Sequence, residues 1–133
     1  MEKFQTFFQL TRLNKPTGFM LLFWPCAWGL TLAFYFSNET DLYLKYLILF
    51  FLGSILMRTA GSIFNDVVDK DFDKKVKRTK ERPIASGKIS NSTALIYVIL
   101  FCLAALVILL QFNLLTIVLG ASSMILAFAY PFM

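Results

Sequence analysis

The chain has 133 residues, of which 58% are hydrophobic and only 16% charged, and its formal net charge is +5. Soluble domains average about 45–50% apolar and about 25% charged residues, so this composition excludes an ordinary water-soluble protein. The segments 16–38 and 89–133 contain no Asp, Glu, Lys or Arg at all. Such stretches cannot form a water-exposed surface, and we expect a lipid bilayer to be the partner of this chain.

Four apolar segments are long enough to cross a bilayer, since a helical span needs about 20 predominantly apolar residues. The sequence predicts these spans at about 17–36, 43–64, 93–110 and 114–130. Short polar segments at 37–41 and 111–113 separate the members of each pair, so paired helices are expected to run antiparallel. The predicted fold is an all-α membrane protein with four transmembrane helices, in one domain covering residues 1–133.

Lysine and arginine gather before the first span and in the connection 65–92, and two spans separate these regions. Short basic segments tend to stay on the cytoplasmic side of a membrane. We therefore expect the N-terminus and the 65–92 connection to be cytoplasmic. The same residues do not indicate binding of nucleic acid, because acidic residues are interleaved with them.

An acidic segment follows the second span. If the helix continues into it, Asp66, Asp69 and Asp73 fall on one face. Asn65 lies beside this stripe, whereas Asp71 points to the opposite side. Three carboxylates on one stripe repel one another unless a cation lies between them. Oxygen ligands of this kind suit Mg²⁺ that is shared with a substrate phosphate.

Basic residues accompany the acidic stripe. Arg58 lies inside the second apolar span, where an ionised side chain costs about 2.5 kcal/mol or more and is usually retained for a pathway or a partner. Helix geometry places it on the same stripe as Asn65 and Asp69. Donors suited to phosphate oxygens follow the acidic segment at Lys77, Arg78, Lys80 and Arg82.

Three other interpretations remain open at this point. The acidic residues of a solvated polar loop could pair with its own lysines. A non-catalytic membrane protein could bind a divalent cation or anionic lipid headgroups through residues 65–88. A small structural four-helix membrane protein is the third alternative. A lipid-binding patch has no use for three carboxylates on one helix face, and a structural protein does not explain Arg58 within a span.

Several blocks follow one another in the chain: Arg12-Leu13-Asn14-Lys15-Pro16-Thr17-Gly18, Trp24-Pro25 with Trp28, Met57-Arg58-Thr59-Ala60-Gly61, Asn65-Asp66-x-x-Asp69-x-x-x-Asp73, and Arg78-Thr79-x-x-Arg82-Pro83 with Ser86-Gly87. Together they resemble the UbiA-type intramembrane aromatic prenyltransferases. The acidic block resembles the first aspartate-rich motif of that family. The N-terminal block is similar to the branch that acts on 4-hydroxybenzoate rather than to the haem-farnesylating branch.

The resemblance implies an enzyme, a transferase of prenyl groups in a bacterial inner membrane or its equivalent. It would move a polyprenyl chain from polyprenyl diphosphate to the ring carbon ortho to the hydroxyl of 4-hydroxybenzoate, an early step of ubiquinone biosynthesis, with Mg²⁺ as cofactor. The implied catalytic and metal-binding residues are Asp66, Asp69 and Asp73, with Asn65 completing or orienting the metal site. The implied diphosphate ligands are Arg58, Lys77, Arg78 and Arg82, and the implied partners of the aromatic carboxylate are Arg12 and Lys15.

One feature departs from the family pattern. The resemblance implies a nine-helix bundle with a second aspartate-rich loop in its other half, whereas this chain has a single acidic cluster. We therefore expect the chain to correspond to the N-terminal part of such a bundle. A complementary C-terminal half is expected as a partner, and the chain alone is expected to be inactive.

Overall fold

The computed structural model describes all 133 residues and contains helices but no strands. Its four long helices satisfy the length and hydropathy that a membrane span requires, which confirms the predicted all-α architecture. The long helices are α2 (Thr17–Ser37), α3 (Thr40–Val68), α5 (Asn91–Leu109) and α6 (Leu114–Ala129), and α6 reaches span length together with the 3₁₀ helix that directly follows it, as Leu114–Phe132. The short ones are α1 (Glu2–Thr11), α4 (Lys70–Lys75) and the 3₁₀ helix η1 (Tyr130–Phe132).

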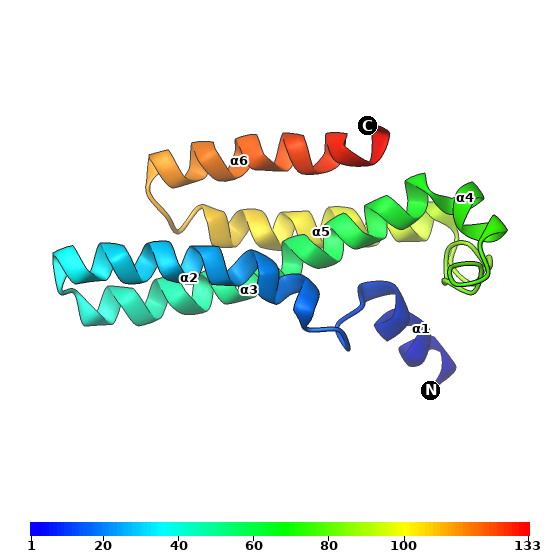
Figure 1. Cartoon of the computed structure of the whole chain (residues 1–133), viewed down its shortest axis with the longest axis horizontal. Helices are drawn as coiled ribbons and strands as arrows, with labels where there is room; N and C mark the ends of the chain where they lie inside the picture. Colours follow the sequence, from blue (N-terminus) through cyan, green and yellow to red (C-terminus); the bar gives the residue numbers. More distant parts are fainter.

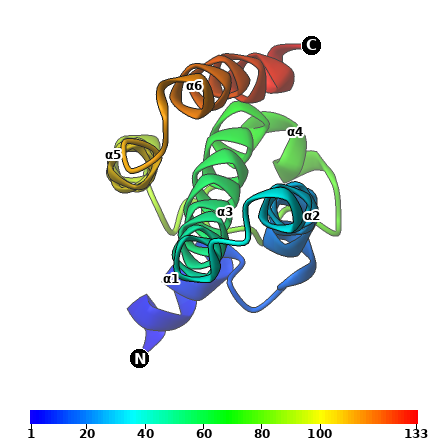
Figure 2. The same ribbon diagram turned by 90° about the vertical axis from the view of Figure 1, so that its left-hand side faces the viewer.

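Helix α3 is the centre of the bundle. It packs along α2 on one side and along α5 on the other, and α6 lies on the outside (Figures 1 and 2). No residue of α6 is buried, although the helix is strongly apolar. Its side chains are therefore available to lipid or to further helices, as is usual for transmembrane helices.

Polar residues mark the helix ends that the sequence predicted. The Ser90 hydroxyl accepts a hydrogen bond from the backbone N–H of Thr93 at the start of α5. The Asn113 side chain accepts one from Thr116 at the start of α6. Helix α2 ends at Ser37, and the next residue, Asn38, adopts the left-handed conformation with φ 57° and donates its backbone N–H to the Phe34 carbonyl. These caps pair backbone groups that the helix ends leave without a partner, so each connection can remain short.

The predicted loop 65–92 is wrong in its first part. Helix α3 runs to Val68, and α4 follows after Asp69. The hydrogen bonding is nearly continuous here, because Asp69 N–H donates to the Asn65 carbonyl and Asp73 N–H donates to the Asp69 carbonyl. The backbone of Asp69, with φ −87° and ψ 7°, lies outside the helical region, and the chain changes direction there.

A small core lies at the end of the bundle where α1, α3, α5 and the 76–90 loop meet. Leu10, Ile63 and Ile84 are fully buried in it. Leu10 and Ile84 lie outside the spans, and burying such side chains away from water contributes about 1.5–3 kcal/mol each. This core fixes α1 and the loop against the bundle, and thereby positions the polar residues that follow Leu10 and precede Ile84.

Candidate functional site

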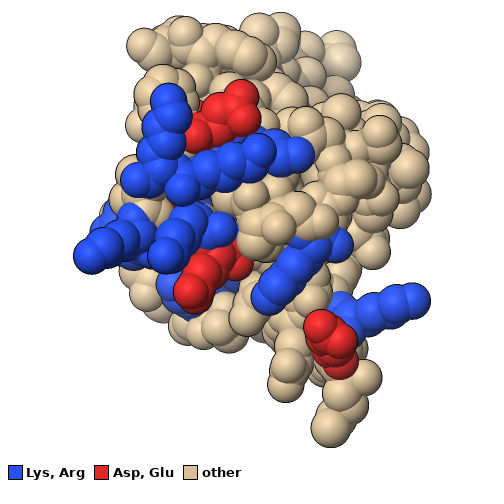
Figure 3. Space-filling view, turned by 90° about the vertical axis from the view of Figure 1, so that its right-hand side faces the viewer, with Lys and Arg blue, Asp and Glu red and all other residues tan.

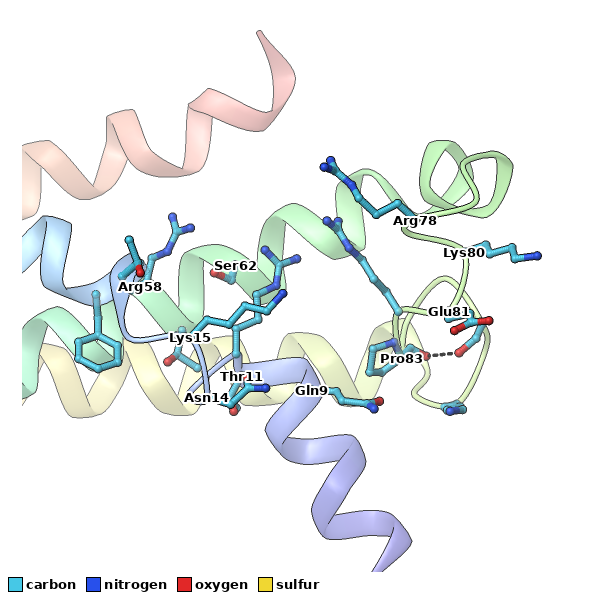
Figure 4. Close-up of a pocket in the computed structure, with 18 of the residues that line it drawn as sticks. Gln9, Thr11, Asn14, Lys15, Arg58, Ser62, Arg78, Lys80, Glu81 and Pro83 are labelled. Carbon is cyan, nitrogen blue, oxygen red and sulfur yellow. Dashed lines mark hydrogen bonds between the residues drawn. The ribbon is translucent and has the colours of Figure 1, made fainter.

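A cleft of about 1120 Å³ opens at this end of the bundle, between the chain entering α2, the middle of α3 and the 76–90 loop (Figure 4). Only 2 of its 19 lining residues are hydrophobic. Lys and Arg side chains gather on this face of the molecule (Figure 3). Glu81 is the only acidic residue that lines the cleft. The seven basic residues lining it are Arg12, Lys15, Arg58, Arg78, Lys80, Arg82 and Lys88. A concave surface of this composition concentrates anions.

The N-terminal side of the cleft is formed by the turn between α1 and α2. Arg12 adopts a left-handed conformation with φ 54°, and its backbone N–H caps α1 by donating to the Phe8 carbonyl. Because Leu10 is anchored in the core, this turn is held in place. It brings both Arg12 and Lys15 to the cleft, as Figure 4 shows for Lys15.

Arg58 reaches the cleft from α3 because α2 carries a glycine opposite it. A Cβ atom at Gly18 would lie 2.8 Å from the Nε atom of Arg58, so a larger residue there would displace the guanidinium. Arg58 forms no salt bridge with any carboxylate of the chain. Its charge is therefore available to an anion in the cleft.

Two buried carboxylates stand behind the cleft. Asp66 is 2% exposed and Asp73 is 7% exposed. The Nη1 atom of Arg82 donates to Asp66 Oδ1 and to Asp73 Oδ2, at 3.0 Å in each case. Arg12 Nη2 forms a second salt bridge with Asp66 Oδ1. Buried charges are tolerated only when they are paired, and here two guanidinium groups pair two carboxylates.

The other acidic residues of the segment lie differently. The Nδ2 atom of Asn65 donates a hydrogen bond to Oδ2 of Asp69, about one helical turn further along the chain, at 2.9 Å. The side chain of Asp71 is 91% exposed and faces Lys74, on the side predicted for it. Because the backbone turns at Asp69, the predicted stripe of three carboxylates does not converge on one point. No group of three acidic, histidine or cysteine side chains is close enough to hold a metal ion by itself.

The converging pair Asp66 and Asp73 nevertheless fits Mg²⁺ in donor type and in number. Magnesium is usually bound in proteins through one or two carboxylates together with substrate phosphates. Both carboxylates approach one nitrogen of Arg82, so they already share a common partner. Asn65 and Asp69, which are hydrogen-bonded to each other, supply further oxygen donors in the same segment.

The remaining predicted residues divide into two groups. Arg78 lines the cleft, whereas Lys77 is exposed and does not line it. Two residues absent from the predicted site also contribute. Lys88 lines the cleft, and its basic side chain was the only sequence signal for it. The buried Thr79 hydroxyl donates to the Asp73 carbonyl at 2.9 Å and fastens the loop to α4, a contact that no local pattern indicates.

Comparison with known proteins identifies close relatives. The model of the UbiA prenyltransferase family matches residues 22–133. The 4-hydroxybenzoate octaprenyltransferase of Alkalilimnicola ehrlichii is 47% identical over 94% of this chain and 41% of its own length. That of Nitrosomonas eutropha is 44% identical over 98% of the chain and 44% of its own length.

The mitochondrial 4-hydroxybenzoate polyprenyltransferase of Caenorhabditis elegans is also similar, with 44% identity over 94% of this chain and 35% of its own length. The chain therefore spans less than half the length of these curated relatives. No solved structure matches the chain.

Proposed function

The chain belongs to the UbiA prenyltransferase family, and we propose that it forms the part of a membrane-embedded active site that binds the diphosphate of a polyprenyl diphosphate. The full reaction would transfer the polyprenyl group to the ring carbon ortho to the hydroxyl of 4-hydroxybenzoate, in ubiquinone biosynthesis. The observation that carries this proposal is the cleft lined by seven basic residues with two buried carboxylates behind it.

The chemistry requires a good leaving group and a stabilised carbocation. When the allylic carbon–oxygen bond breaks, the electron pair leaves with the diphosphate, and nearby cations stabilise the charge that develops there. Arg58, Arg78 and Lys80 line the cleft without a carboxylate partner, so their donors are available to phosphate oxygens. Lys77 is proposed as a weaker contributor, because it lies outside the cleft.

We propose Mg²⁺ as the cofactor, held by Asp66 and Asp73 with Asp69 and Asn65 beside them. When bound, the ion supplies positive charge to the leaving diphosphate. Asp66 and Asp73 lie at the joint between α3 and α4, where backbone hydrogen bonds and the buried Thr79 fix the second carboxylate. The protein thus presents these oxygens from rigid elements rather than from a free loop.

The aromatic acid is proposed to meet the N-terminal side of the cleft. Lys15 has no carboxylate partner there and can pair with the acceptor carboxylate. Arg12, the other residue considered for this role, is engaged with Asp66. We assign Lys15 the contact with the acceptor and Arg12 the attachment of the α1–α2 turn to α3.

Four apolar spans and membership of the family make the chain an integral membrane protein. We propose that the cleft end is cytoplasmic, because the Lys and Arg excess lies there. In a chain with Cys26 and Cys102 replaced by alanine, Ser86→Cys is expected to react with a membrane-impermeant maleimide only from the cytoplasmic side, and Ser37→Cys only from the opposite side. The reverse labelling pattern would overturn this orientation.

Binding of geranyl diphosphate to the chain in nanodiscs of zwitterionic lipid tests the proposed function. We expect affinity to fall about tenfold or more when Mg²⁺ is removed with EDTA, because the carboxylates then oppose the phosphate charge. Geranyl monophosphate is the matched control and is expected to bind more weakly and with little dependence on Mg²⁺. Equal affinity for both ligands, or for anionic lipid in place of either, would favour the alternative of a non-catalytic lipid-binding protein.

A further inference from the structure

We propose that Arg82 is an internal counter-ion for Asp66 and Asp73, and that it exchanges these carboxylates for phosphate oxygens when a diphosphate and a divalent cation enter the cleft. This inference rests on the proposed function and deepens it. It assigns Arg82 two alternating partners, whereas the sequence indicated only a contact with phosphate.

The two carboxylates, Asp66 and Asp73, converge on a space that holds one cation. A single nitrogen, Arg82 Nη1, lies 3.0 Å from Asp66 Oδ1 and 3.0 Å from Asp73 Oδ2. A divalent cation that used both carboxylates would need the space between these oxygens, where this nitrogen lies. Like charges repel, so the guanidinium and the cation compete for the same pair of carboxylates.

Arg82 is placed so that its side chain can change partners while its backbone stays fixed. Its N–H donates to the Thr79 carbonyl at 3.0 Å, and the next two residues, Pro83 and Ile84, are buried. The side chain is 29% exposed and also lines the cleft. A guanidinium has five N–H donors, so a phosphate in the cleft can accept hydrogen bonds that replace those to the carboxylates.

The two carboxylates depend on Arg82 to different extents. Asp66 keeps Arg12 as a second partner, whereas Arg82 is the only cation within salt-bridge distance of Asp73. If Arg82 moves to a phosphate, Asp73 is left buried without a counter-charge, which is costly unless another cation replaces it. Diphosphate and cation are therefore expected to bind cooperatively, each raising the affinity of the other.

Removal of the Arg82 charge is expected to have opposite effects on the two ligands. In nanodiscs of zwitterionic lipid, Mn²⁺ serves as the probe for the cation, and its free concentration is measured by electron paramagnetic resonance without any phosphate present. Arg82→Gln is expected to bind Mn²⁺ about fivefold or more tightly than the wild type, because the only guanidinium that pairs with Asp73 is gone and Asp66 keeps Arg12 alone. The same variant is expected to bind geranyl diphosphate with Mg²⁺ about tenfold or more weakly.

Arg78→Gln is the matched control for the Mn²⁺ measurement. It removes the same charge from the same cleft but from a residue that pairs with no carboxylate, so its Mn²⁺ affinity is expected to stay within about twofold of the wild type. Arg82→Lys retains the charge and should bind Mn²⁺ like the wild type, so a gain confined to Arg82→Gln reports the loss of the charge and not the loss of the arginine side chain's shape. A gain in Mn²⁺ affinity shared by Arg82→Gln and Arg78→Gln, or absent from both, would refute the exchange. If instead the wild type showed no Mg²⁺-dependent binding of geranyl diphosphate, the proposed function itself would be refuted.

Discussion

Reconstituted alone in liposomes with Mg²⁺, the 133-residue chain is expected to form prenylated 4-hydroxybenzoate orders of magnitude more slowly than an assembly that also contains a second acidic loop. A diphosphate carries several negative charges, and each uncompensated charge is costly in a site with little water. The chain offers one converging pair of buried carboxylates, Asp66 and Asp73, and therefore one place for a dication.

Co-expression of this chain with a partner chain provides the assembly against which the rate of product formation is compared. The partner chain would be the segment of the Alkalilimnicola ehrlichii relative that lies beyond the region matched here. Helix association in lipid depends on complementary surfaces rather than on a continuous chain. No residue of α6 is buried, so the surface of this helix is free to pack against the helices of a partner chain. Product formation is expected to appear on co-expression. Robust turnover by the 133-residue chain alone would show that one acidic cluster suffices, or that two copies of the chain combine.

Asp73→Asn is expected to weaken Mg²⁺-dependent binding of geranyl diphosphate by about tenfold or more, close to the loss expected on removing Mg²⁺, because one of the two carboxylates proposed to hold the ion is gone. The substitution removes one of the two carboxylates that converge on Arg82 and leaves the amide with little affinity for a hard cation. Asp69→Asn is expected to act in the same direction but more weakly, since that carboxylate belongs to the same segment and is hydrogen-bonded to Asn65 rather than to Arg82.

Asp71→Asn is the matched control for this measurement. It makes the same chemical change in the same short helix, but its side chain is 91% exposed and faces Lys74. Its geranyl diphosphate affinity is expected to stay within about twofold of the wild type, because a surface ion pair contributes little. If all three variants lost affinity equally, the distinction between a buried and an exposed face of this segment would be wrong.

The four spans were predictable to within a few residues because a bilayer imposes a minimum apolar length on any helix that crosses it. The predicted second span, 43–64, was too short at both ends, because α3 runs from Thr40 to Val68. At the C-terminal end, hydropathy does not register that the polar residues from Asn65 onward continue the helical hydrogen bonding of α3. Helices α1 and α4 were missed. Helices of this length are marginal on their own and depend on tertiary contacts such as the burial of Leu10.

The residue types of the site were also predictable, but its pairings were not. Arg58 was identifiable because an arginine is costly within a span. Its close approach to Gly18 required the crossing of α2 and α3 to be known. The contact between Arg12 and Asp66 joins residues 54 positions apart, and that between Arg82 and Asp66 joins residues 16 apart. No local spacing encodes such pairs, because they arise from the packing of α1 and the loop against α3.

The place at which geranyl diphosphate binds tests the central claim most directly. Ser86 is exposed and lines the basic cleft, whereas Ser37 lines a second cavity of about 470 Å³ at the opposite end of the bundle. In chains with Cys26 and Cys102 replaced by alanine, the rate of maleimide labelling would be measured at Ser86→Cys and at Ser37→Cys. Geranyl diphosphate with Mg²⁺ is predicted to slow labelling at Ser86→Cys and to leave Ser37→Cys unchanged. Saturating ligand that protected only Ser37→Cys, or neither position, would contradict the assignment of the basic cleft as the diphosphate site.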